Sequence, residues 1–187
     1  MPSTAKILKD EIVYSAYKIV KDHGVEAMTT RAIAQKLKCS VQPIYYAFEN
    51  LDNLRDAVLA KAMQKYTEVL RAETPKIIRI KAVGLNFIRF ARDYPNLFRF
   101  IFYTDRQENT NITDTSLDAN RSFVVQLIQE EHGVSAIRAD EIYIKMGIFC
   151  HGIASMVMAK TAKFTDADVE RLISELCECL VRGCGRL

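Results

Sequence analysis

Residues 29–48 read TTRAIAQKLKCSVQPIYYAF and have the most informative pattern in the chain. Thr29 is a good N-cap for a helix, because its hydroxyl can accept a hydrogen bond from a free backbone N–H. That helix is expected to end near Leu37. A second short helix follows, with Ser40 as its expected N-cap, and runs to about Phe48. The spacing predicts two short helices separated by a tight turn, which is a helix-turn-helix arrangement.

The remainder of the chain also has helical periodicity. Glycine and proline are scarce, with 7 and 4 residues, which argues against a sandwich or barrel of many strands. We therefore expect an all-α chain of about nine helices, with a polar loop over 107–114. Besides the two short helices, the expected helices cover residues 7–23, 51–73, 77–93, 95–103, 116–132 and 140–160, and a last helix that Thr165 caps.

The composition is that of an ordinary globular protein. Of 187 residues, 49% are hydrophobic and 26% are charged, and the net charge is +3, so we expect neither a disordered chain nor a polycation. The most apolar stretch, residues 146–159, is too short to span a bilayer and is expected to be a buried helix. We therefore expect no membrane partner.

Cysteine and histidine usage predicts no disulfide framework, no metal site and no cofactor. The 5 cysteines are an odd number, so reduced thiols in a cytosol are expected. The 3 histidines lie far apart in the sequence. We find no nucleophile motif, no phosphate-binding glycine loop and no paired carboxylates with a partner base, and therefore expect a cytoplasmic protein that is not an enzyme.

The second short helix has residue types suited to reading DNA. Ile44 and Phe48 are expected to form its buried face, so that its first residues are presented to a major groove. Gln42 can bond bidentately to adenine, and Val41 or Pro43 can touch a thymine methyl group.

Phosphate contacts are expected around this helix. Tyr45 and Tyr46 offer phenol hydroxyls to phosphate oxygens. The helix start at Thr29, Thr30 and Arg31 combines free backbone amides with a cation. Spacing alone leaves open a plain αα-hairpin whose tyrosines lie on a solvated face.

Residues 29–48, followed by Leu54, resemble the N-terminal DNA-binding domain of the TetR family of transcriptional regulators. The family pattern is Thr, Ile-Ala, a Gly-Val-Ser turn, Tyr-x-x-Phe and Lys-x-x-Leu. Lys38 replaces the turn glycine, Cys39 replaces the valine, and Leu51 replaces the lysine. The resemblance implies a positive φ angle at Lys38. It also implies that a phosphate contact is lost at Leu51, and Lys38, Tyr45 and Tyr46 can make such a contact instead.

The same resemblance implies two domains: residues 1–50 bind DNA, and residues 51–187 bind an effector and form a dimer. The implied function is a sequence-specific repressor that a small, largely apolar effector releases from a palindromic double-stranded operator. Activation, and a helical protein-interaction module without DNA binding, remain alternatives. In the family, bases or their flanks are contacted at the positions of Gln42, Pro43 and Tyr46, and phosphates at those of Thr29, Arg31, Ser40 and Tyr45.

A homodimer is expected through the last two helices, because one recognition helix reads few base pairs and a two-fold pair doubles the site. Helix 140–160 is apolar nearly all round and has to be covered on two sides. A stripe on the last helix would add to a four-helix interface: Val169, Leu172, Ile173, Leu176 and Leu180. The alternative is that these two helices bury each other within a monomer.

An effector cavity is expected between helices of the second domain. Its candidate lining residues are Tyr66, Phe87, Phe90, Phe98, Phe102, Phe123, Met146 and Cys150. The alternative is plain core, since aromatic residues at helical spacing are usually that. His151 is interpreted as a core or interface histidine, and Cys39 as a small packing residue rather than a redox sensor.

Overall fold

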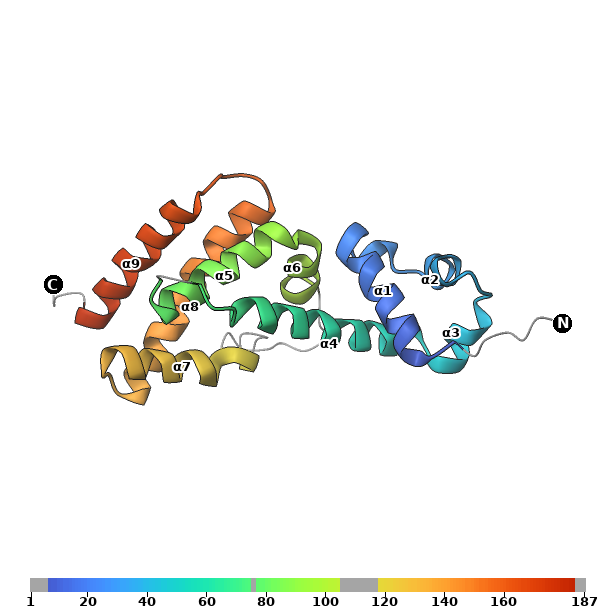
Figure 1. The fold of residues 1–187 in the computed structure, drawn as a ribbon, viewed down its shortest axis with the longest axis horizontal. Helices are drawn as coiled ribbons and strands as arrows, with labels where there is room; N and C mark the ends of the chain where they lie inside the picture. Colours follow the sequence, from blue (N-terminus) through green and yellow to red (C-terminus); the bar gives the residue numbers. More distant parts are fainter. Residues whose placement is uncertain (1–6, 75–76, 105–117, 184–187) are drawn as a thin grey trace. The chain divides into compact units, whose positions relative to one another are not determined.

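Nine α-helices make up most of the described part of the protein, which comprises residues 7–74, 77–104 and 118–183 of a computed structural model (Figure 1). These residues contain no strand, and none of their helices is both long and apolar enough to cross a membrane. The prediction of an all-α chain is therefore confirmed. The helices are α1 (Lys9–His23), α2 (Thr30–Leu37), α3 (Gln42–Ala47), α4 (Leu51–Leu70), α5 (Arg79–Asp93), α6 (Pro95–Phe102), α7 (Asp118–His132), α8 (Ala136–Met158) and α9 (Asp166–Arg182), with a 3-10 helix at Val25–Ala27.

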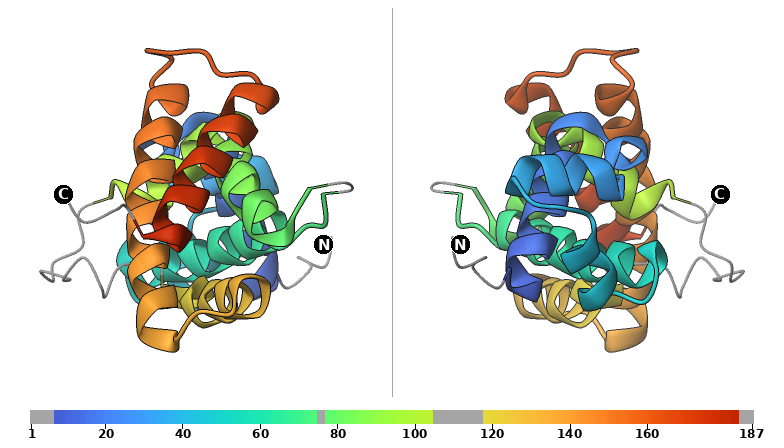
Figure 2. Two further views of the ribbon diagram at one scale, coloured as in Figure 1. Left: turned by 90° about the vertical axis from the view of Figure 1, so that its left-hand side faces the viewer. Right: turned by 90° about the vertical axis from the view of Figure 1, so that its right-hand side faces the viewer.

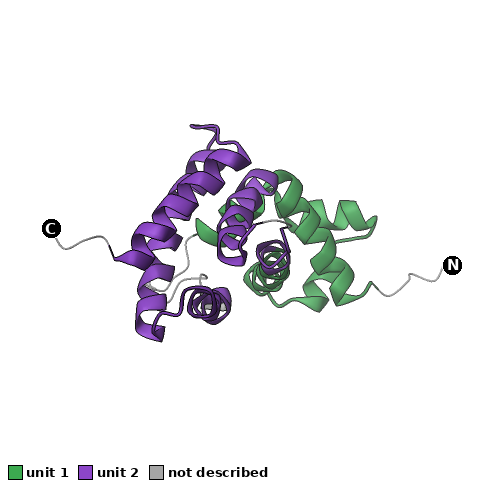
Figure 3. Ribbon diagram, turned by 60° about the vertical axis from the view of Figure 1, so that its left-hand side comes forward, with its two compact units in different colours: residues 1–65, 96–104 green, residues 66–95, 105–187 purple. Residues whose placement is uncertain are grey.

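Two compact units divide the chain (Figure 3). The first comprises Met1–Lys65 and Asn96–Thr104, and the second comprises Tyr66–Pro95 and Asp105–Leu187. Helix α4 begins in the first unit and ends in the second. The functional division expected at residue 50 is a separate matter and stays a prediction.

The helix-turn-helix begins as the sequence predicts. The hydroxyl of Thr29 accepts a hydrogen bond from the backbone N–H of Ala32 at 3.1 Å, which caps α2. Lys38 ends this helix in the left-handed region, with φ 54° and ψ 43°. The N–H of Cys39 then donates to the carbonyl of Ala34 at 3.0 Å, which is how such a turn satisfies a free carbonyl. The positive φ angle expected at Lys38 is confirmed.

The start of α3 differs from the prediction. Val41, not Ser40, is the N-cap residue of this helix, and no side chain caps it. A Ser40 cap would bond to the N–H of the second or third helical residue, and the third would be Pro43, which has no N–H. The expected Ser40 cap is therefore wrong.

The long helix α4 ends at Leu70 rather than near Glu73. The side-chain amide of Asn86, which is 3% exposed, donates to the backbone carbonyl of Ala72 at 2.8 Å. A longer bond of 3.5 Å reaches the carbonyl of Leu70. These bonds satisfy carbonyls that have no partner inside a helix, so α5 helps to define where α4 stops.

Side-chain caps also set the start of the last two helices. Ser135 accepts a hydrogen bond from the N–H of Arg138 at 3.3 Å, so α8 begins at Ala136 and not at the expected residue 140. Thr165 and Asp168 form the expected capping box of α9. The loop expected at 107–114 and the helix start at 116 lie outside the described residues.

The core of the second unit is built around α5. Helices α7, α8 and α9 all pack against α5, and α9 also packs against α8 (Figure 2). Phe90 on α5 is fully buried. Arg89 pairs with Asp166 across α5 and α9 at 2.6 Å, and Arg121 pairs with Asp140 across α7 and α8 at 2.7 Å. The second unit is thus a helical bundle closed by partly buried ion pairs.

The substitution Lys38→Gly should raise the free energy of unfolding by about 0.5–1 kcal/mol, because glycine adopts a positive φ angle without the steric cost of a side chain. The matched control is Lys36→Gly, inside the same helix, which should lower it by about 1 kcal/mol. Urea denaturation followed by circular dichroism measures both. Destabilisation by both variants to a similar extent would contradict the left-handed turn.

Candidate functional site

The second helix of the helix-turn-helix exposes the residues expected to read DNA. Ile44 and Phe48 are 2% and 5% exposed and hold the inner face of this helix. Tyr46 is 81% exposed, Tyr45 is 59% exposed and Val41 is 37% exposed. Tyrosines this open contribute little to the core, so their face is available to a partner.

Two of these exposed side chains are bonded to each other. The side-chain N–H of Gln42 donates to the hydroxyl of Tyr46 at 3.1 Å. The bond uses one of the two amide hydrogens and leaves the other, with the amide oxygen, for a base edge. An adenine presents the complementary acceptor and donor in the major groove. This pair was not predicted from the sequence, although the spacing of four residues on a helix could have indicated it.

The residues expected to contact phosphates lie around the same helices. The hydroxyl of Thr29 already accepts the capping hydrogen bond of α2, so this oxygen is only partly available for a contact with a phosphate. Exposed residues of this group are Thr29, Arg31, Lys38 and Ser40, whereas Thr30 and the base-contact candidate Pro43 are half-buried. The N-terminus of α2 also presents backbone N–H groups, which favour an anion.

A lysine from another helix also reaches α3. Leu51 begins α4 and is 41% exposed, at the position where the TetR pattern has lysine. The Nζ atom of Lys9, on α1, lies 4.7 Å from the ring centroid of Phe48, which is a cation–π distance. This places a cation beside the C-terminal end of α3. The sequence did not indicate it, because Lys9 and Phe48 are distant along the chain.

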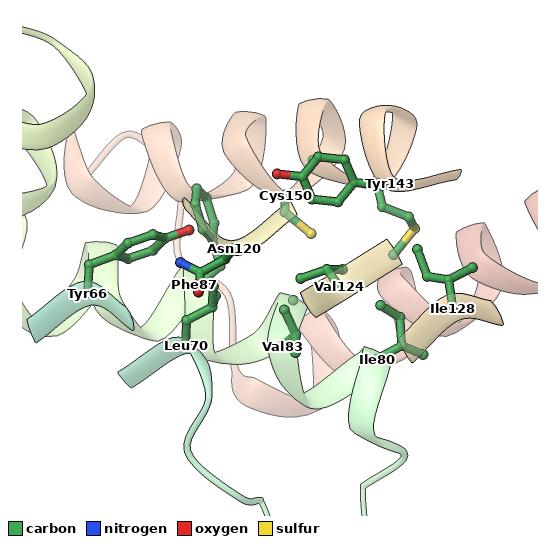
Figure 4. Close-up of a pocket in the computed structure, with 13 residues that line it drawn as sticks. Tyr66, Leu70, Ile80, Val83, Phe87, Asn120, Val124, Ile128, Tyr143 and Cys150 are labelled. Atoms are coloured by element: carbon green, nitrogen blue, oxygen red, sulfur yellow. The ribbon is translucent and has the colours of Figure 1, made fainter. Parts of the chain in front are cut away.

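The second unit contains a small apolar cavity of about 60 Å³ (Figure 4). Four of the eight residues proposed from the sequence line it: Tyr66, Phe87, Met146 and Cys150. The sequence did not indicate its other lining residues: Leu70, Ile80, Val83, Gly84, Asn120, Val124, Ile128, Tyr143 and Gly147. Tyr66, Phe87 and Asn120 lie at one end, and Ile80 and Ile128 lie at the other.

The other four proposed residues lie elsewhere. Phe90 is fully buried and packs edge-on against Tyr66, with ring centroids 5.3 Å apart. Phe98 and Phe102 belong to the first unit, where their rings lie 4.8 Å apart. Phe123 lies under the guanidinium of Arg71, which is 4.5 Å from the ring centroid. Periodicity could not separate these positions, because core and cavity residues share the same helical faces.

The cavity is electrically neutral. Burial raises the pKa of the Cys150 thiol to about 12, and it also raises the pKa of the Tyr66 phenol. His151, whose ring centroid lies 5.8 Å from that of Phe87, has its pKa lowered by burial and is neutral at pH 7. No lining residue is Asp, Glu, Lys or Arg. An ionised group inside the cavity would therefore be desolvated without a counter-charge.

Asn120 joins α7 to α4 at the cavity wall. Its amide nitrogen donates to the hydroxyl of Thr67 at 3.2 Å, and its oxygen accepts a bond from Nε of Arg71 at 2.9 Å. Asn120 is only 2% exposed. We call this set of three residues the Asn120 clamp. Any molecule that enters the cavity beside Asn120 meets the contacts that hold the end of α4.

The outward face of α8 is apolar near its end. Ile148 is 56% exposed and Met156 is 39% exposed. Gly152 lies between them in the sequence, and a Cβ atom added there would have no neighbouring group within 4 Å. On α9, three of the five stripe residues are buried inside the unit, whereas Leu172 and Leu176 are half-buried. The stripe thus serves mainly the core of its own unit, and α8 offers the larger free apolar surface.

Among the described residues, no three His, Cys, Asp or Glu side chains are grouped so that they could hold a metal ion. The Sγ atom of Cys177 lies 3.6 Å from Nε2 of His132. Burial raises the pKa of this thiol, which disfavours the reactive thiolate. The pair is therefore a poor nucleophile.

The substitution Asn120→Ala should lower the free energy of unfolding by about 1–3 kcal/mol, because it leaves Thr67 and Arg71 without their shared partner. Asn53→Ala, on the exposed side of α4, is the control and should have little effect. Chemical denaturation measures both. An unchanged unfolding free energy for Asn120→Ala would contradict the clamp.

No protein-family model matches the sequence, and no curated protein matches it. Solved structures do resemble its fold. A protein of Pseudomonas aeruginosa PAO1, described as a transcriptional regulator, has a TM-score of 0.71 at 16% identity, covering 94% of this chain and 91% of that one. A TetR-like transcriptional regulator from Rhodococcus sp. RHA1 has a TM-score of 0.65 at 16% identity, covering 98% and 99%. A TetR variant of Acinetobacter baumannii AYE in complex with minocycline has a TM-score of 0.58 at 18% identity, covering 95% and 96%. The chain therefore has the fold of TetR-like transcriptional regulators.

Proposed function

We propose that the protein is a sequence-specific, DNA-binding transcriptional regulator of the cytoplasm, and that it acts as a repressor. The observation that carries the proposal is the geometry of α3. Its inner face is anchored by Ile44, while Gln42, Tyr45 and Tyr46 are exposed beyond a left-handed turn. A helix held this way can place its N-terminal residues against base edges in a major groove.

In this proposal, base reading and phosphate binding are divided between the two short helices. Gln42, held by Tyr46, reads an adenine, and Val41 and Pro43 approach thymine methyl groups. Phosphate oxygens are held by Thr29, Thr30, Arg31, Lys38, Ser40 and Tyr45. Lys9 supplies a cation near the end of α3 and offsets the absence of a lysine at Leu51.

We propose that two copies bind together through α8 and α9. The exposed Ile148 and Met156 on α8 and the half-buried Leu172 and Leu176 on α9 supply the apolar contact. A two-fold pair matches a palindromic site whose half-sites lie about 34–36 Å apart. The dimer thus doubles the number of base pairs that are read.

A small effector is proposed to release the DNA by a population shift. The cavity of about 60 Å³ is far below the ~300–1,000 Å³ of typical ligand sites, so an effector has to enlarge it. Its wall includes Tyr66 and Leu70 of α4 and Asn120 of the Asn120 clamp. Because α4 continues into the unit that carries the helix-turn-helix, a displacement of its end can change the spacing of two recognition helices.

The alternative is a helical protein-interaction module without DNA binding. Binding to random-sequence duplex DNA at a series of salt concentrations distinguishes the two. A DNA-binding protein should bind at low salt and lose affinity steeply as salt rises, because bound counterions are released from the duplex. The absence of binding even at low salt would favour the interaction module.

The substitution Tyr46→Ala should weaken binding to a duplex enriched by the wild-type protein by about 1–3 kcal/mol. Tyr46→Phe keeps the ring but loses the bond to Gln42, so it should chiefly reduce the discrimination between adenine and other bases. Fluorescence anisotropy with matched and single-base-changed duplexes measures both effects. Tyr103→Ala, an exposed tyrosine after α6, is the control; an equal loss there would remove Tyr46 from the DNA contacts.

The substitution Ile148→Glu should convert a dimer into a monomer, because it places a charge in the proposed apolar contact. Sedimentation at micromolar concentration should show the mass halved, and DNA affinity should fall with it. Ile78→Glu, which adds the same charge at another exposed isoleucine, should leave the mass unchanged. A wild-type protein that sediments as a monomer would contradict the proposed dimer.

A further inference from the structure

A second hollow adjoins the apolar cavity. It has a volume of about 460 Å³ and lies between the end of α4, α5 and α7. The two spaces share Leu70 and Val83 in their walls. The hollow differs in chemistry from its neighbour, because it is lined by charged and polar side chains as well as by Phe123: Arg71, Glu73, Thr74 and Arg79. Leu70 and Val83 thus line both an apolar space and a space with charged side chains, Arg71 among them.

Arg71 is oriented but has no carboxylate partner among the described residues. Its Nε donates to Asn120 at 2.9 Å, and its guanidinium lies 4.5 Å from the ring centroid of Phe123. These contacts fix the plane of the guanidinium and occupy neither of its terminal nitrogens. Other arginines of this unit are neutralised: Arg79 pairs with Glu130 at 3.3 Å, and Arg121 pairs with Asp140 at 2.7 Å.

A fixed guanidinium with its terminal nitrogens open is suited to a carboxylate, which can accept two parallel hydrogen bonds. The neutral cavity beyond Leu70 and Val83 cannot take an ionised group, but it can take a hydrocarbon chain. One molecule that satisfies both spaces has a single negative head and an apolar tail.

We propose that the effector is an amphiphilic carboxylate whose head binds Arg71 in the hollow and whose chain passes between Leu70 and Val83 into the apolar cavity. This inference rests on the proposed function only in naming the ligand an effector. The head would bind the guanidinium whose Nε holds Asn120, so occupancy acts directly on the Asn120 clamp and on the end of α4. Burial of the ligand's hydrocarbon chain would offset the free energy needed to enlarge the cavity.

Isothermal titration calorimetry on the DNA-free protein tests the site with three probes of one chain length: decanoate, decanol and decyltrimethylammonium, each below its micelle concentration. Decanoate should bind about tenfold or more tightly than the other two. Its affinity should exceed that of hexanoate, because a longer chain buries more apolar surface. Equal affinities for decanoate and decanol, or no binding of decanoate, would overturn the proposal.

Three variants locate the head. Arg71→Gln should abolish the preference for decanoate, and Arg71→Lys should keep part of it. Arg171→Gln, which removes the same charge from an exposed position on α9, should change nothing. Thermal denaturation shows whether each variant is folded. If Arg71→Gln does not fold, the decanoate preference of Arg71→Lys still tests the site. Equal losses in the Arg71 and Arg171 variants would overturn the assignment. DNA binding is measured separately without ligand, so a failure there would contradict the proposed function and leave the carboxylate site standing.

Discussion

The burial of Ile44 and Phe48 determines which side chains of α3 form the proposed DNA-binding surface. These two side chains fix the rotation of α3 about its own axis, since they are 2% and 5% exposed. With about 3.6 residues per turn, the same rotation forces Gln42 and Tyr46 outward. The left-handed turn at Lys38 lets α3 follow α2 without a longer loop. The surface is therefore a consequence of core packing, with the Gln42–Tyr46 bond adding order to side chains that solvent would otherwise leave mobile.

A second constraint connects the cavity to α4. The end of this helix is held by polar bonds from Asn86 and Asn120, both nearly buried. Buried polar contacts are costly to break singly, because the abandoned partner stays desolvated. A ligand that breaks several of these hydrogen bonds together, and forms new ones with the same groups, lowers the free-energy cost of the rearrangement. This is a physical reason to expect regulation at the Asn120 clamp rather than in the aromatic core around Phe90.

The sequence predicted the helices and most of their caps, because capping and turn chemistry are local. The prediction failed at Ser40, where Pro43 removes one of the two N–H groups that a cap could bond, and it began α8 too late by overlooking Ser135 as its cap. The residues that line the cavity were harder to predict, because they come from four helices whose apolar faces are alike. Phe90 had the same pattern as true lining residues, and Asn120 was missed because a single polar residue on a helix gives no indication of what it will meet.

Selection of bound duplexes from a random-sequence pool tests whether α3 reads DNA as one half of a two-fold pair. We expect an inverted repeat whose half-sites are centred about 10–10.5 base pairs apart, or a multiple of that spacing, with an invariant A·T pair in each half. Enrichment of a single, unrepeated half-site would contradict the paired arrangement. A pool that shows no sequence preference after repeated rounds would contradict DNA reading by α3 itself.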